Sequence, residues 1–65
     1  MRILVTGSSG RIGGAICARL SLRHRIIGLD LRPGPMTTVI GDVCDARQLA
    51  GLCVDVDAVI HTAAL

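Results

Sequence analysis

The chain contains no aromatic residue and no lysine, so all seven of its positively charged side chains are arginines. These arginines are scattered, apart from a loose group at Arg19, Arg23 and Arg25. A nucleic-acid surface usually combines a basic patch with aromatic side chains or with a helix that reads a groove. The composition therefore does not favour a nucleic-acid partner, and we interpret the arginine group as the solvated end of a helix.

Long apolar runs and paired cysteines are also missing. No run approaches the roughly 18 apolar residues of a membrane span, and the three apolar residues after Arg2 are too few for a signal peptide. Cys17, Cys44 and Cys53 are odd in number and show no CxxC spacing, which argues against a disulfide framework and against a zinc site. We therefore expect free thiols in a reducing, cytoplasmic compartment, with no membrane contact and no metal.

The most informative segment is TGSSGRIG at residues 6–13, which directly follows the apolar residues 3–5. Its glycines suit three needs: a tight turn after a strand, close approach of the backbone to a phosphate, and close packing of the next helix on the strand. The first N–H groups of that helix and the positive end of its dipole would then face the anion. A strand, this turn and a helix in that order indicate a dinucleotide pyrophosphate site.

Apolar runs alternate with helical patterns along the rest of the chain, which predicts an α/β fold with a parallel sheet. We expect strands at residues 2–5, 26–29, 38–40 and 58–61, and helices at residues 11–22 and 46–52. The first helix shows an apolar face at Ile12, Ala15, Ile16 and Leu20. The second begins with Asp45 as its N-cap and Gln48 as the capping-box partner.

The connection between the second and third strands leaves two topologies open. Parallel strands are usually joined by a dozen or more residues, and here about seven are available. Seven extended residues span roughly 23 Å, which suffices for a parallel crossover without a helix. A hairpin is the competing interpretation, and it would place Asp42 at the opposite edge of the sheet.

Asp30 lies 17 residues after Gly13, at the end of the predicted second strand. A dinucleotide-binding fold places there the acid that holds the hydroxyls of the adenosine ribose. The alternative is a loop aspartate that caps a turn. A carboxylate at this position repels a 2′-phosphate and favours NAD over NADP, although the nearby Arg32 opposes that preference.

Four motifs in register resemble the extended short-chain dehydrogenase/reductases, that is, the NAD-dependent epimerase/dehydratase family. They are TGxxGxxG, the acid after the second strand, GDVCD at residues 41–45 and DAVIHTAA at residues 57–64. The classical branch of this superfamily has a glycine pattern similar to TGxxxGxG. This chain departs from that pattern, because Arg11 stands where the pattern has glycine. The resemblance covers essentially the whole chain and implies a Rossmann-type parallel sheet. Residues 1–65 would form the N-terminal part of an NAD(P)-binding Rossmann domain, an incomplete first half with about four strands, one long helix and one short helix.

The resemblance also implies roles for residues beyond the glycines. Asp42 would bind the adenine amino group with Val43 against the ring, and residues 62–64 would pass beneath the cofactor. For Asp42 a turn-forming role remains open, and for His61 we favour packing or hydrogen bonding near the sheet edge over catalysis. The expected cofactor-binding residues are Gly7, Ser9, Gly10, Arg11, Ile12, Gly13, Asp30, Leu31, Arg32, Asp42, Val43, Thr62, Ala63 and Ala64.

For the whole enzyme, the resemblance implies hydride transfer with a Tyr as the acid/base, a Lys that lowers the pKa of the Tyr, and a Ser or Thr that orients the substrate. This chain has neither Tyr nor Lys, so we expect no catalytic residue in it. One hypothesis is that it is the NAD-binding portion of an epimerase, dehydratase or reductase for a sugar nucleotide or a similar carbonyl or alcohol substrate, with a homodimeric parent. The other is a non-catalytic, redox-sensing NAD(P)-binding module, and a YxxxK motif in a longer sequence would distinguish the two.

Overall fold

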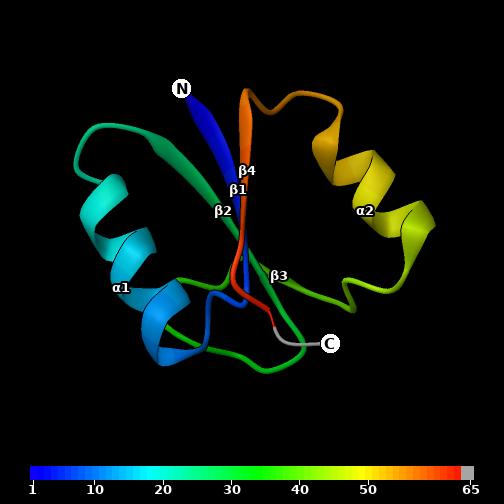
Figure 1. The fold of residues 1–65 in the computed structure, drawn as a ribbon, viewed down its shortest axis with the longest axis horizontal. Coiled ribbons are helices and arrows are strands. Elements are labelled where there is room, and N and C mark those ends of the chain that lie inside the picture. The colour runs from blue at the N-terminus through cyan, green and yellow to red at the C-terminus, as the bar shows by residue number, and fades with distance from the viewer. Residues whose placement is uncertain (64–65) are drawn as a thin grey trace.

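The computed structural model describes residues 1–63 and shows one parallel sheet flanked by two helices (Figure 1). Along the chain the elements are β1 (Arg2–Thr6), α1 (Arg11–Leu20), β2 (Arg25–Asp30), β3 (Val39–Ile40), α2 (Ala46–Cys53) and β4 (Ala58–His61). The strand order is β3-β2-β1-β4. All strand pairs are parallel, so the predicted Rossmann-type α/β sheet is confirmed.

The connection from β2 to β3 is a parallel crossover and not a hairpin. Leu29 pairs with Val39 and Asp30 with Ile40, while the Thr38 N–H donates to the Gly28 carbonyl at 2.9 Å. The connection contains no helix and makes a turn at residues 35–36, where the Thr37 N–H donates to the Gly34 carbonyl at 3.1 Å, before the chain pairs with β2 as β3. The carboxyl ends of the four described strands therefore lie at the same edge of the sheet.

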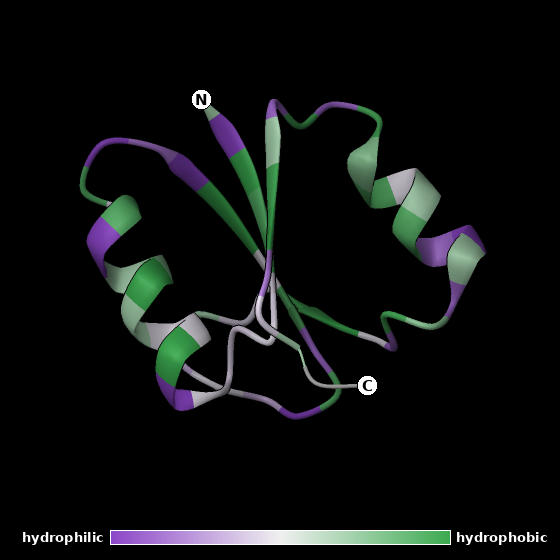
Figure 2. Cartoon of the chain, in the orientation of Figure 1, coloured by the Kyte–Doolittle hydropathy of each residue, from purple (hydrophilic) through white to green (hydrophobic). Residues whose placement is uncertain are grey.

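The core lies between the sheet and α1, where Ile3, Val5 and Cys17 are almost completely shielded from solvent. β1 is the central strand, with β2 on one side and β4 on the other. Leu4, also in β1, is completely buried although it points to the other face. Figure 2 shows the apolar residues running along the strands between the two helices.

The apolar face expected for α1 was partly wrong. Ile12 is 70% exposed and Ala15 is exposed, whereas Gly13 and Cys17 are the buried residues of this helix. Because Gly13 has no side chain, the helix approaches the sheet along the row that contains Gly13 and Cys17. The helix also ends at Leu20, two residues earlier than expected, where the His24 N–H donates to the Leu20 carbonyl at 2.9 Å as the chain turns towards β2.

The second helix begins at Ala46 with Asp45 as its N-cap, as the sequence predicts, but the Gln48 side chain does not complete a capping box, because the Asp45 N–H donates to the Asp42 carbonyl at 2.9 Å. The Asp45 carboxylate accepts a hydrogen bond of 3.2 Å from the Gln48 N–H, which satisfies one of the free amide groups of the first turn. α2 lies on the opposite side of the strands from α1 (Figure 1). It has no fully buried residue, so its packing on the described part of the sheet is light.

Candidate functional site

The turn after β1 depends on Gly7, which has a φ of 77°. This left-handed conformation favours glycine because a Cβ is strained there. A Cβ at Gly7 would also lie 2.6 Å from Thr62 Oγ1 and 2.9 Å from the Ala63 nitrogen. The turn is held by hydrogen bonds from the Gly7 N–H to the Leu29 carbonyl at 2.8 Å and from the Gly10 N–H to the Gly7 carbonyl at 3.0 Å.

Gly13 and Gly10 place the start of α1 directly against this turn. A Cβ at Gly13 would overlap the Gly7 carbonyl and lie 2.7 Å from Thr62 Oγ1. Gly10 is the N-cap in an extended conformation, and within residues 1–63 no side chain caps the helix. The first N–H groups of α1 are therefore free to bind an anion, and the dipole of the helix favours one.

Asp30, at the end of β2, is held in place by two backbone amides. Its Oδ1 accepts a hydrogen bond of 3.1 Å from the Arg32 N–H, and its Oδ2 accepts one of 2.9 Å from the Ser9 N–H. The Arg32 amide is the largest cause that holds the pKa of Asp30 below its ordinary value. The Ser9 amide and the Arg32 charge add to this, while partial burial opposes it. The carboxylate is thus ionised and fixed beside the turn formed by residues 7–10, which we call the glycine turn.

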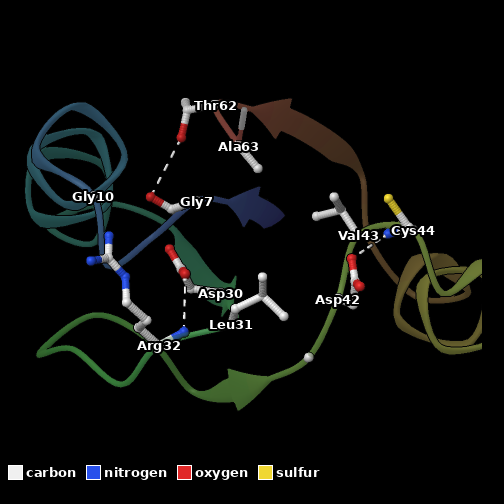
Figure 3. A pocket seen from close by; sticks show the side chains of 11 residues that line it. Gly7, Gly10, Asp30, Leu31, Arg32, Asp42, Val43, Cys44, Thr62 and Ala63 are labelled. Atoms are coloured by element: carbon white, nitrogen blue, oxygen red, sulfur yellow. Dashed lines mark hydrogen bonds between the residues drawn. The ribbon is translucent and has the colours of Figure 1, made fainter. Parts of the chain in front are cut away.

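These elements enclose an open cleft of about 490 Å³ at the carboxyl edge of the sheet. Figure 3 shows Asp30, Leu31 and Arg32 on one side, Asp42, Val43 and Cys44 on the other, and Thr62 with Ala63 above Gly7. The lining residues are Gly7, Gly10, Asp30, Leu31, Arg32, Gly41, Asp42, Val43, Cys44, Thr62 and Ala63. Residues from four separate segments of the chain therefore meet at one cleft.

Some of the residues expected at the site do not line the cleft. Arg11 and Ile12 are exposed at the start of α1, and Gly13 is buried behind the turn. Ser9 belongs to the turn itself, and its N–H donates to Asp30 Oδ2. Ala64 lies outside the described residues. Two lining residues, Gly41 and Cys44, were not expected. Their position within the GDVCD motif is the signal that could have indicated them.

Asp42 has the turn-forming role that the sequence left open. Its Oδ1 accepts a hydrogen bond of 2.8 Å from the Cys44 N–H, and its carbonyl accepts one of 2.9 Å from the Asp45 N–H. Within the described part of the chain its Oδ2 has no hydrogen-bond donor, so the turn occupies only one side-chain oxygen. The same carboxylate can both shape the loop and face a ligand.

The end of β4 is tied to the end of β1 by side chains. Thr62 Oγ1 donates to the Thr6 carbonyl at 2.6 Å, and the Thr62 N–H donates to Thr6 Oγ1 at 3.2 Å. His61 Nδ1 lies 2.7 Å from the same Thr6 Oγ1. His61 thus makes a hydrogen bond near the sheet edge, as expected from the sequence.

Comparison with known proteins agrees with this geometry. At 35% identity over 71 aligned positions, the chain is similar to a 3-beta-hydroxysteroid dehydrogenase of Mycolicibacterium neoaurum, with 98% of the chain and 19% of that protein covered. It also superposes on the crystal structure of a short-chain dehydrogenase/reductase superfamily protein from Agrobacterium tumefaciens with bound NAD. The TM-score is 0.84 and the identity 38%, and the match covers 100% of this chain and 21% of that one.

The chain therefore spans about a fifth of the length of these two relatives. In the part of it that the structure describes, no helix is both long enough and apolar enough to cross a membrane. The family model for the NAD-dependent epimerases and dehydratases matches residues 3–65. The chain belongs to the NAD-dependent epimerase/dehydratase family, within the extended short-chain dehydrogenases/reductases.

Proposed function

We propose that residues 1–65 are the N-terminal part of an NAD(P)-binding Rossmann domain and bind NAD in the cleft at the carboxyl edge of the sheet. The observation that carries this proposal is the Asp30 carboxylate, which backbone amides of Ser9 and Arg32 fix beside the glycine turn. A carboxylate in this place suits the two hydroxyls of an adenosine ribose. The relative from Agrobacterium tumefaciens, whose structure contains NAD, supports the same assignment.

The other residues of the cleft fit the remaining parts of the cofactor. Gly7 and Gly10 expose backbone without a Cβ, and the uncapped start of α1 adds the N–H groups of Arg11, Ile12 and Gly13 for the pyrophosphate. On the far side of the cleft, Asp42 would hold the adenine amino group with Val43 against the ring. Thr62 and Ala63 would lie beneath the cofactor, where small side chains allow close approach.

Asp30 also gives the basis for a preference of NAD over NADP. Two like charges about 4 Å apart, at an effective dielectric constant near 20, repel by about 4 kcal/mol before screening. Arg32 lines the same cleft and reduces this repulsion, so the preference is set by the balance between the two side chains.

When bound, NAD supplies the hydride acceptor or donor for dehydrogenase, epimerase or dehydratase chemistry. Our proposal for the longer protein is such an enzyme, acting on a sugar nucleotide or a similar carbonyl or alcohol substrate, cytoplasmic and homodimeric. The 65 residues hold neither Tyr nor Lys, so a Tyr–Lys acid/base pair would have to come from other residues. This chain's own contribution is to bind and orient the cofactor.

The test is a calorimetric titration of NAD and NADP into the chain and into Asp30→Ala. We expect the unsubstituted chain to bind NAD more tightly, and Asp30→Ala to weaken NAD and shift the ratio of the two dissociation constants towards NADP. Asp55→Ala is the matched control, because it removes one negative charge from an exposed residue that does not line the cleft.

The same variants can be measured in a chimera in which this chain replaces the matching fifth of the Agrobacterium tumefaciens protein, so the result does not depend on the solubility of the short chain. An unchanged NAD/NADP ratio in Asp30→Ala would refute the ribose assignment.

A further inference from the structure

The loop between β2 and β3 is fastened to the glycine turn by a row of three hydroxyl groups. Thr37 Oγ1 lies within hydrogen-bond distance of Ser8 Oγ and 2.6 Å from Ser9 Oγ. Ser9 Oγ in turn donates to the Arg32 carbonyl. Ser8 is only 1% exposed, so its hydroxyl depends on this partner and not on solvent.

The direction of each hydrogen bond follows from the number of protons. The Arg32 carbonyl can only accept, so the single hydroxyl proton of Ser9 is used there. Thr37 must then donate to Ser9, which uses the single hydroxyl proton of Thr37. Ser8 must therefore donate to Thr37. The hydrogen bonds of the three hydroxyls all run in one direction and end on the Arg32 carbonyl, and we call this arrangement the hydroxyl chain. In such an arrangement each hydrogen bond polarises and strengthens the next.

Through Ser9, the row of three hydroxyls positions both charged residues that are expected near the adenosine ribose, Asp30 and Arg32. The Ser9 N–H donates to Asp30 Oδ2 at 2.9 Å, and the Ser9 hydroxyl holds the carbonyl of Arg32. The loop also closes tightly around Ser9, because a Cβ at Gly34 would lie 2.6 Å from Ser9 Oγ, and the Thr37 N–H donates to the Gly34 carbonyl at 3.1 Å. Thr37 is the outer support of this arrangement, although it does not line the cleft.

We propose that Thr37 is a positioning residue that sets the discrimination between NAD and NADP, by holding Ser9 and thereby the relative positions of Asp30 and Arg32. The inference rests on the proposed cofactor site. Asp30 repels a 2′-phosphate and Arg32 attracts one, so a change in their relative positions changes the ratio of the two affinities. A support that merely stabilised the fold would change both affinities by the same factor.

The experiment compares Thr37→Val, Thr37→Ser and Thr38→Val by titration with NAD and with NADP. Thr37→Val keeps the branched shape and removes the hydroxyl, and we expect the NAD/NADP preference to fall by about three- to tenfold, which corresponds to the loss of one hydrogen bond. Thr37→Ser keeps the hydroxyl and should retain the preference. Thr38→Val is the control, because the Thr38 hydroxyl contacts the backbone of Gly28 and no residue of the glycine turn.

Circular dichroism shows whether each variant is folded. A folded Thr37→Val protein with an unchanged ratio, or with both affinities reduced equally, would overturn the inference. If Thr37→Val does not fold, Ser9→Ala decides the matter, since it removes the hold on the Arg32 carbonyl and keeps the amide that binds Asp30. The same fall in preference is expected there, and its absence would overturn the inference.

The two proposals fail in different ways. If the unsubstituted chain binds neither cofactor, the cofactor site itself is refuted, and this inference with it. If Asp30→Ala loses the preference for NAD and Thr37→Val keeps it, only the role of Thr37 is refuted.

Discussion

Replacing Gly13 with alanine should destabilise the fold, although alanine is the better helix former. The added Cβ would overlap the Gly7 carbonyl and lie 2.7 Å from Thr62 Oγ1. The Gly7 carbonyl cannot easily move, because Gly7 is held at a φ of 77° and its carbonyl accepts the Gly10 N–H at 3.0 Å. The most severe clash is therefore with rigid backbone and not with a side chain.

The magnitude follows from two opposing effects. Overpacking against rigid surroundings costs about 3 kcal/mol, the upper end of the usual range. The gain in helix propensity from glycine to alanine is about 1 kcal/mol. The expected net loss in the free energy of unfolding is thus about 2 kcal/mol, or roughly 8–16 °C in Tm for a domain of this size.

Gly51→Ala provides the matched comparison. Gly51 is also inside a helix, and a Cβ there has no atom within 4 Å, so only the gain in propensity remains. We expect this variant to be about 1 kcal/mol more stable than the unsubstituted chain.

Urea unfolding followed by far-ultraviolet circular dichroism measures both variants, since the chain has no tryptophan whose fluorescence could be used. If Gly13→Ala proved as stable as the unsubstituted chain, the close packing of α1 on the glycine turn would be refuted.

Two further predictions concern titration and thiol chemistry. Because the amides of Arg32 and Ser9 hold the pKa of Asp30 below its ordinary value, ionised Asp30 stabilises the fold above the unfolded-state pKa of about 3.9, and this stability is lost as the pH falls through the lower folded-state value. The urea midpoint should therefore drop more steeply below about pH 4 for the unsubstituted chain than for Asp30→Asn, and equal slopes would contradict the role of those amides. In native protein N-ethylmaleimide should modify the exposed Cys44 and spare Cys17, which is fully buried and whose pKa burial raises. Mass spectrometry locates the adducts, NAD should protect Cys44 in the cleft, and equal modification of both thiols would contradict the packing of α1.

The sequence predicted the elements of the fold well because their signals are local. The fourth strand was predicted with the bounds observed, and the Asp45 cap is confirmed. The buried row of α1 was not predicted well, because the choice between adjacent helical rows depends on Gly13, and a missing side chain carries no hydropathy signal. The parallel crossover from β2 to β3 was left open for a related reason, since about seven residues allow either topology and only pairing with β2 decides between them.

For the site, the sequence indicated which segments meet but not how they are held together. Nine of the expected residues line the cleft in the described part of the chain. They belong to motifs that lie at or just after the carboxyl ends of the strands. The hydroxyl chain was missed, because Thr37 lies 29 residues from Ser8 and 28 from Ser9. Contacts of that separation depend on the tertiary arrangement, and the sequence around Thr37 gives no local pattern that would indicate them.

The central place of β1 in the sheet affects how the chain folds as it is synthesised. β1 is made first, yet its pairing with β4 joins Ile3 to Ala58, near the end of the described chain. At a synthesis rate of roughly 5–20 residues per second, the second neighbour of β1 is made several seconds after β1 itself. Until then one edge of an apolar strand has no partner, and such edges readily pair with other chains. The order of the strands in the sheet therefore makes the nascent chain vulnerable to aggregation before the cofactor cleft can form.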